Sequence, residues 1–243
     1  AVLTVVWVFV FFNQRNKPED VGLPTMDDLE DGHGDEDSGS KGVRWPKEVV
    51  INILVVGVFY LFVKFIRYAL WSWAPYLLQK NYGLAGDDAG YISTIFDFAG
   101  IAGVIVCGWM SDKFFDGKRA KIAFIFIVGM AISCILLYTA GAASVALFAT
   151  SMGLIGFTLY GPDALMTGAG AIDVGSAKRA TMAAGIVNGM GSVGAVLQEF
   201  ILGALLAEGA VGLVFATLLG SAVAAAACLA YLLYRGKRGL ADI

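Results

Sequence analysis

Long apolar segments separated by short polar ones make up most of the chain. The apolar segments cover roughly 49–78, 89–110, 120–140, 143–168, 179–206 and 210–234. Each is long enough to cross the hydrocarbon core of a bilayer, about 30 Å thick, as a single α-helix. The pattern therefore predicts an all-α, multi-pass membrane bundle of six helices.

Two different segments precede this bundle. Residues 1–12, AVLTVVWVFVFF, are apolar but too few to span a membrane. We interpret them as the end of a preceding transmembrane helix that would begin upstream. Residues 13–47 are rich in Gly, Asp and Ser, and we expect a disordered, acidic, cytoplasmic linker. Residues 48–243 would then be the six-helix bundle with a short cytoplasmic tail.

Composition and charge support a membrane protein and predict its orientation. Apolar residues make up 58% of the 243 residues, and charged residues only 15%. Fourteen of the 17 Lys and Arg residues fall in the linker, two alternate loops and the C-terminal tail. The positive-inside rule places these regions in the cytoplasm. We therefore expect a protein of the cell membrane (the inner membrane where there are two), with both ends of residues 13–243 in the cytoplasm.

Other kinds of chemistry find little support in the sequence. The three cysteines lie inside apolar runs without metal-ligand spacing, which indicates small buried hydrophobes. The acidic stretch DDLEDGHGDEDS places Leu29 and Ser38 where a calcium loop needs oxygen ligands. No nucleophilic triad or phosphate-binding glycine loop appears. We therefore expect no enzyme activity, no metal, no cofactor and no nucleic-acid partner.

The first apolar segment contains two cations that this simple picture does not explain. Lys64 and Arg67 lie near its middle, where each costs about 2.5–3.5 kcal/mol on insertion scales. Helical spacing puts them on one stripe with three aromatic residues, Tyr60, Tyr68 and Trp71. Head groups reaching the bilayer surface are the alternative. We favour a stripe that faces a water-filled interior, where a guanidinium and an ammonium form an anion site.

Few acidic residues are placed to balance these cations inside the membrane. Asp97, Asp163 and Glu199 lie within apolar segments, whereas Asp112 lies near a cytoplasmic end. An intramembrane carboxylate usually pairs with a base or faces an aqueous path. We favour Asp97 as the partner, since adjacent helices could bring it towards the two cations.

The loop GWMSDKFFDGKRAK, residues 108–121, resembles the cytoplasmic loop signature of the major facilitator superfamily. The matching positions are Gly108, Asp112, Gly117, Lys118 and Arg119. An aspartate at a helix end beside a basic tight turn can form a breakable charge latch between helices. The residues expected to form charge pairs or to gate are Asp97, Asp163, Asp112, Lys118 and Arg119.

More specifically, the chain resembles the organophosphate:phosphate antiporter family, which includes glycerol-3-phosphate and hexose-6-phosphate transporters. The stretches NKPEDVGLP, RYALWSWAPYLL, FDFAGIAGVIVCGWMSD, LYGPDALMTGAGAIDVG and GMGSVGA carry the resemblance. It implies the C-terminal six-helix half of a twelve-helix fold, with the N-terminal half missing. Substrate would bind between two bundles that rock to alternate access.

The resemblance also implies roles for individual residues. Arg67 falls on the seventh-helix arginine that grips phosphate, Lys64 on a lysine typical of eukaryotic sugar-phosphate exchangers, and Asp97 on an acid that contacts basic residues near the site. Two positions depart from the pattern. Ser72 stands where the glycerol-3-phosphate transporter has an acid. Val187 and Asn188 stand near a lysine that affects substrate choice in the hexose-phosphate transporter.

These considerations predict exchange of an organic phosphate for inorganic phosphate across the lipid bilayer. The expected substrate-binding residues are Arg67, Lys64, Tyr60, Tyr68, Trp71, Tyr160 and Asn188. Two alternatives stay open: a membrane sensor that binds sugar phosphate without transporting it, and a proton-coupled symporter of another organic anion.

Overall fold

A computed structural model describes residues 2–14, 22, 45–115, 119–167 and 180–240. The chain divides into two units, Ala1–Arg44 and Trp45–Ile243. In the first unit, α1 runs over Val2–Asn13, and its large side chains from Val5 to Phe12 are exposed. The predicted disorder of the linker falls almost wholly outside the described residues. The second unit contains the remaining helices.

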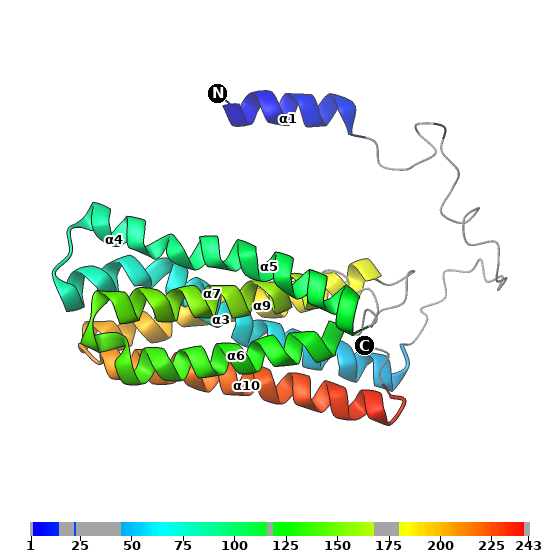
Figure 1. Cartoon of the computed structure of the whole chain (residues 1–243). Helices are drawn as coiled ribbons and strands as arrows, with labels where there is room; N and C mark the ends of the chain where they lie inside the picture. Colours follow the sequence, from blue (N-terminus) through cyan, green and yellow to red (C-terminus); the bar gives the residue numbers. More distant parts are fainter. Residues whose placement is uncertain (1, 15–21, 23–44, 116–118, 168–179, 241–243) are drawn as a thin grey trace. The chain divides into compact units, whose positions relative to one another are not determined.

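The second unit is a bundle of helices that run alongside one another (Figure 1). Its helices, in chain order, are α3 (Lys47–Tyr82), α4 (Gly86–Ser93), α5 (Ile95–Phe114), α6 (Arg119–Ala140), α7 (Val145–Thr167), α9 (Ala180–Ala207) and α10 (Val211–Lys237), with a short 3₁₀ turn, η2 (Gly141–Ala143). Among the described residues, six helical stretches are long and apolar enough to cross a membrane. The predicted all-α, six-span fold is confirmed.

The observed boundaries differ from the sequence prediction in two places. The helix α3 has 36 residues, about 54 Å at 1.5 Å per residue, which is longer than the apolar run 49–78. It ends where Gly83 adopts a left-handed conformation, with φ 66°. The second span is two helices, α4 and α5, that meet at Thr94. There the backbone N–H and the side-chain hydroxyl both donate to the carbonyl of Tyr91, which tightens the turn.

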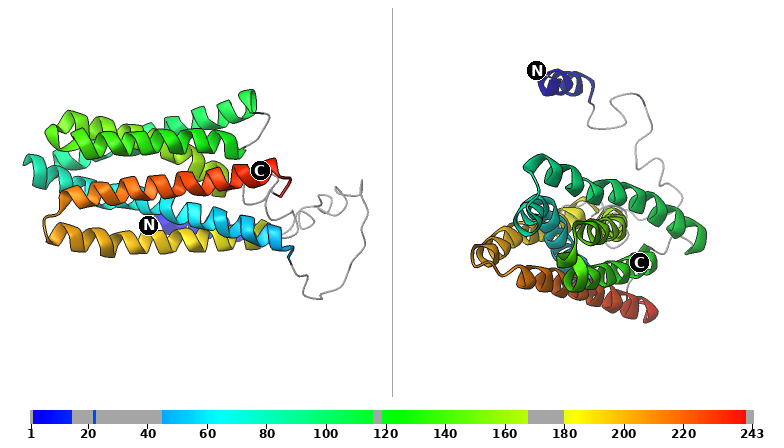
Figure 2. Two further views of the ribbon diagram at one scale, coloured as in Figure 1. Left: turned by 90° about the horizontal axis from the view of Figure 1, so that it is seen from below. Right: turned by 60° about the vertical axis from the view of Figure 1, so that its left-hand side comes forward.

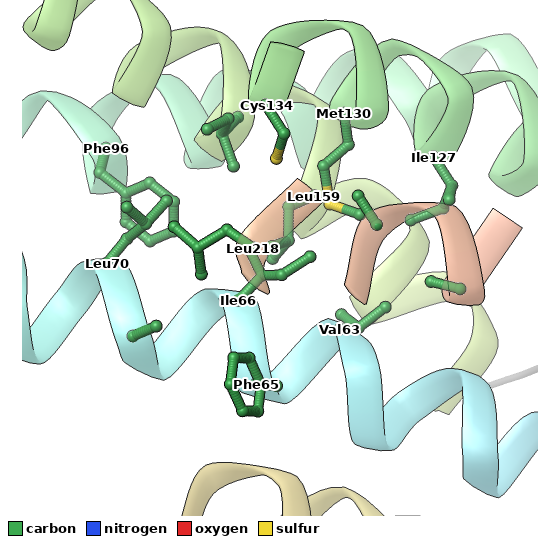
Figure 3. Packing of buried hydrophobic residues seen from close by; sticks show 14 of the residues in the cluster. Val63, Phe65, Ile66, Leu70, Phe96, Ile127, Met130, Cys134, Leu159 and Leu218 are labelled. Atoms are coloured by element: carbon green, nitrogen blue, oxygen red, sulfur yellow. The ribbon is translucent and has the colours of Figure 1, made fainter. Parts of the chain in front are cut away.

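The helix α3 packs against α9, α10, α7 and α4, so it lies within the bundle rather than at its edge. Its buried residues point in several directions. Ile66 and Leu70 face α6, α7 and α10, while Phe65 points the opposite way, towards α9 (Figure 3). Side chains such as Met130 of α6 and Leu159 of α7 fill the space between the helices. A helix buried on several sides can hold polar side chains at fixed positions inside the bundle.

Glycine allows the two closest pairs of helices to approach. A Cβ added at Gly103 of α5 would lie 1.9 Å from the carbonyl oxygen of Phe157 in α7. A Cβ added at Gly194 of α9 would lie 2.1 Å from the carbonyl oxygen of Leu61 in α3. Because lipid gives helices no hydrophobic reason to associate, close backbone packing of this kind is a major source of their attraction.

The start of α3 and the end of α10 lie at the same end of the bundle (Figure 2). The Arg235 guanidinium donates to Asn52 Oδ1 at 2.7 Å and also to the Glu48 carboxylate. Asn52 Nδ2 donates to the carbonyl of Leu240 at 2.9 Å. Arg235 and Asn52 are buried. The sequence gives no sign of this cluster, because Arg235 stands in a basic tail whose charge pattern predicts only loop residues.

Candidate anion-binding site

Arg67, in the middle of α3, forms an ion pair with Asp163 of α7. The guanidinium donates through Nη1 to Asp163 Oδ2. The two partners differ in exposure: 37% of the Arg67 side chain is exposed, but only 6% of the Asp163 side chain. The carboxylate therefore holds one edge of the guanidinium from inside the bundle and leaves other N–H groups free to meet a ligand.

Tyr160 connects this ion pair to Asp97. The Arg67 Cζ atom lies 4.3 Å from the centre of the Tyr160 ring, a cation–π contact. The Tyr160 hydroxyl donates a hydrogen bond to Asp97 Oδ1 in α5. Tyr160 and Asp163 are three residues apart and therefore share one face of α7. The result is a chain of contacts from α3 through α7 to α5.

Among the described residues, Arg67 forms its ion pair with Asp163 and not with Asp97, the partner that the sequence favoured. The reason is the order of the helices. The helix α5 packs mainly along α7, whereas α3 packs along α9, α10 and α7. Tyr160 of α7 therefore lies between Asp97 and Arg67 and links them without a direct ion pair.

These side chains line a pocket with a volume of about 260 Å³. Its lining residues are Arg67, Tyr68, Trp71, Asp97 and Tyr160. A second pocket of about 190 Å³ shares Trp71 and Asp97 with the first and reaches Ser93 and Thr94 at the α4–α5 junction. One pocket thus offers a guanidinium, and its neighbour offers hydroxyl groups. Together they can hold an anionic group and a polar organic group side by side.

Lys64 lies on the α9 side of α3, apart from this pocket. Its ammonium donates to Asn188 Oδ1 at 2.8 Å and to Ser192 Oγ at 3.4 Å, and lies 4.9 Å from the centre of the Tyr60 ring. Arg67 and the two aromatic residues that follow it line the pocket, while Tyr60 and Lys64 are buried and contact α9. Tyr60 and Lys64 also interact electrostatically with Asp163, so the predicted stripe stays connected through this carboxylate.

The contact with α9 explains how a lysine is accommodated within a membrane span. Lys64 itself is only 9% exposed, but both hydrogen-bond acceptors are exposed side chains of α9. Gly191 lies between them, and a Cβ there would be 2.4 Å from Tyr60 Cδ1 and 3.0 Å from Lys64 Cδ. The missing side chain lets the lysine cross the interface to the open edge of α9. The head group does not have to reach the bilayer surface.

A second carboxylate approaches α3 from α9. Ser72 Oγ donates to Glu199 Oε1 at 2.8 Å, and Gln198 Nε2 donates to the same oxygen at 2.8 Å. Ser72 is the position at which the family resemblance would place an acid. The structure brings a carboxylate to this position from another helix. The sequence offered one signal, an acid inside the fifth apolar segment, but no way to pair it with Ser72.

The predicted loop latch is only partly described. Asp112 is exposed near the end of α5, and no ion pair to it occurs among the described residues. Lys118 lies outside the described residues, and Arg119 begins α6. The latch therefore stays a prediction.

Comparison with known proteins identifies the family. Residues 56–241 match the Major Facilitator Superfamily. The chain is 28% identical over 203 residues to a glycerol-3-phosphate transporter of Bacillus subtilis, which covers 80% of this chain and 46% of that protein. It is 30% identical over 210 residues to the membrane sensor protein UhpC of Escherichia coli, and the match covers 83% of this chain and 48% of that protein. It is 25% identical over 229 residues to sugar phosphate exchanger 3 of Gallus gallus, and the match covers 80% of this chain and 45% of that protein.

The chain spans about half the length of these relatives. The six long apolar helices among its described residues, together with its relatives, make it a multi-pass membrane protein. The chain belongs to the Major Facilitator Superfamily, and its relatives match the organophosphate:phosphate antiporter family that its motifs resemble.

Proposed function

We propose that the protein is a secondary transporter that exchanges an organic phosphate for inorganic phosphate. In this proposal residues 45–240 form the C-terminal bundle of a twelve-helix protein in a cell membrane, with both ends in the cytoplasm. The observation that carries the proposal is the Arg67 guanidinium, which Asp163 holds at one edge and which opens into a pocket at mid-span.

The chemistry of this arrangement suits a phosphate group. A guanidinium can give two parallel N–H groups to two phosphate oxygens, and such charge-assisted bonds are strong in a site shielded from water. Asp163 limits the rotation of the guanidinium, and the Tyr160 ring supports it from one side. The Arg67 guanidinium is therefore already oriented when it binds a phosphate group, which reduces the conformational entropy lost on binding.

The adjoining pocket would receive the organic part of the substrate. The Ser93 and Thr94 hydroxyls already donate to backbone carbonyls, so their oxygens are left as acceptors for substrate hydroxyl groups. Trp71 lines both pockets and offers an apolar surface to a carbon skeleton. Inorganic phosphate would fill only the pocket that contains Arg67, whereas an organic phosphate would fill both.

Obligate exchange follows from the charges. Asp97 and Asp163 formally balance Lys64 and Arg67, and a basic residue of the partner bundle would add the charge that a phosphate neutralises. The two bundles can then close over either an organic phosphate or inorganic phosphate. An empty site leaves that charge unmatched, and a ligand drives closure only by binding the closed state better. The loop residues Asp112, Lys118 and Arg119 would form the latch that opens and closes with this motion.

The test is counterflow in proteoliposomes made with the intact protein. Vesicles loaded with inorganic phosphate should take up labelled phosphate and glycerol 3-phosphate. Arg67→Lys keeps the charge but loses the two-pronged hydrogen bond, so uptake should fall at least tenfold, while membrane insertion is unchanged. Lys113→Gln removes an exposed charge far along α5 and serves as the control. Near wild-type exchange by Arg67→Lys would contradict the proposed role.

A second function is kept because one relative with 30% identity is named a membrane sensor protein. A sensor would bind organic phosphate in the same pocket without moving it across the membrane. Protection from thermal unfolding by glycerol 3-phosphate, measured together with zero counterflow, would select the sensor. Net uptake driven by a pH gradient without internal phosphate would instead indicate a proton-coupled symporter.

A further inference from the structure

An apolar groove runs between α3 and α10 near the end of the bundle where the Arg235 cluster lies. Its volume is about 420 Å³, and its lining includes Ile51, Leu54 and Val58 of α3 with Ala227, Cys228 and Tyr231 of α10. The Arg67 pocket shares no residue with it. Four of these side chains are among the exposed ones, so the groove opens to the surroundings of the bundle.

The groove is apolar, and a membrane-spanning position of its helices would surround it with lipid rather than water. Both of its walls belong to helices that are long and apolar enough to cross a membrane. Tyr231, Tyr234 and Trp45 lie near the same end of the bundle, and aromatic residues of this kind gather at the membrane–water interface. The groove therefore lies just inside one leaflet, at the depth of the first part of a lipid acyl chain.

Each wall of the groove is followed by a basic side chain at the end that lies towards the membrane–water interface. Lys47 lies one helical turn before Ile51 and seven residues before Leu54, so it shares their face of α3. Arg238 is the residue that follows the end of α10, seven residues after Tyr231, and its guanidinium stacks 4.5 Å from the centre of the Tyr234 ring. Both basic residues are exposed. A lipid in the groove would thus carry its headgroup between two cations.

Among the described residues, the Glu48 carboxylate does not cancel this charge. Glu48 lies beside Lys47, but it is paired with Arg235. The Arg235 guanidinium also binds Asn52 and therefore has its own partners. Lys47, Lys237 and Arg238 are left to face the headgroup region, and basic pockets between transmembrane helices at the cytoplasmic side select anionic lipids.

We propose that this groove is a binding site for one anionic phospholipid. An acyl chain lies against Ile51, Leu54, Ala227 and Cys228, and the phosphate meets Lys47 and Arg238. The acyl chain gains little binding free energy by moving from bulk lipid into the groove, because both environments are apolar. The preference for one lipid over another therefore comes from the headgroup. Each basic residue near a charged headgroup contributes about fivefold to the preference for anionic over zwitterionic lipid.

Native mass spectrometry of the intact, delipidated protein tests this site. The protein is given equal amounts of phosphatidylglycerol and phosphatidylcholine with the same acyl chains. Wild type should retain one phosphatidylglycerol with a preference of at least tenfold. The Lys47→Gln/Arg238→Gln double variant should lower that preference to threefold or less. Lys113→Gln, which removes a comparable exposed lysine from α5, should leave it unchanged.

A second variant separates the groove from the headgroup contacts. Ala227→Trp should fill the groove and abolish retention of the tightly bound lipid, whereas Ile105→Trp on the exposed face of α5 should not. Equal retention of both lipids by wild type would overturn the proposal. So would an unchanged preference in the double variant, or wild type that retains no more lipid than Ala227→Trp. The last outcome would mean that protein, from this chain or another copy, covers the groove.

Discussion

The ion pair between Arg67 and Asp163 makes a prediction that separates two carboxylates of the same region. Asp163→Asn keeps the size and hydrogen-bonding shape of the side chain but removes its charge. The Arg67 guanidinium then lacks a counter-charge inside a membrane span. Asp97→Asn is the matched control, because its amide oxygen can still accept a hydrogen bond from the Tyr160 hydroxyl, and no ion pair among the described residues is lost. The structure predicts unequal effects for two chemically identical changes.

The exposure of the two partners sets the size of the effect. Removing one partner of a fully buried ion pair costs about 3–5 kcal/mol. Asp163 is buried, but 37% of the Arg67 side chain is exposed, so water and pocket contents screen part of this cost. We expect Asp163→Asn to lower the free energy of unfolding by about 2 kcal/mol, and Asp97→Asn by less than about 0.5 kcal/mol.

Thermal unfolding in detergent, followed with a thiol-reactive fluorophore, measures the difference. Cys107 and Cys134 are fully buried, so they react only when the bundle opens, and the partly exposed Cys228 is replaced by Ser in every protein compared. For a domain of this size, about 2 kcal/mol corresponds to a shift of roughly 4–8 °C. Combining Asp163→Asn with Arg67→Gln should recover part of the loss, since the guanidinium that lacked its counter-charge is then absent. Equal shifts for the two single variants, or no recovery in the double variant, would refute the assigned pairing.

Three further predictions test the contacts around the site. Tyr160→Phe should bind phosphate within about threefold of wild type, whereas Tyr160→Leu should lose about fivefold to thirtyfold in a binding assay, because only the latter removes the cation–π contact. Gly103→Ala should lower the unfolding temperature, as its Cβ would meet a backbone carbonyl, while Gly108→Ala in the same helix meets nothing and should be neutral. Asn188→Leu should destabilise the protein more than Lys64→Leu/Asn188→Leu, because only the single variant leaves the ammonium without its closest acceptor; equal unfolding temperatures would argue against this contact.

Much of the architecture could be predicted from the lengths of the apolar runs along the sequence. Apolar run length fixed the number of spans, because a bilayer demands about 20 residues per helix whatever surrounds them. The same reasoning picked out Lys64 and Arg67, since cations are costly in such segments. The break at Thr94 could not be predicted in this way. It depends on local hydrogen bonds to the carbonyl of Tyr91, and the apolar run gives no sign of them.

The partners of the charged residues depended on how the helices pack. Periodicity put Lys64 and Arg67 on one stripe of α3, but the stripe curves around the helix far enough to face α9 at one end and α7 at the other. Likewise, nothing in the sequence could rank Asp163 above Asp97, or join Ser72 to Glu199. A sequence records which side chains an individual helix carries. Which of them meet depends on glycine-controlled approaches between helices and on which helix lies between two others, and only the tertiary structure decides this.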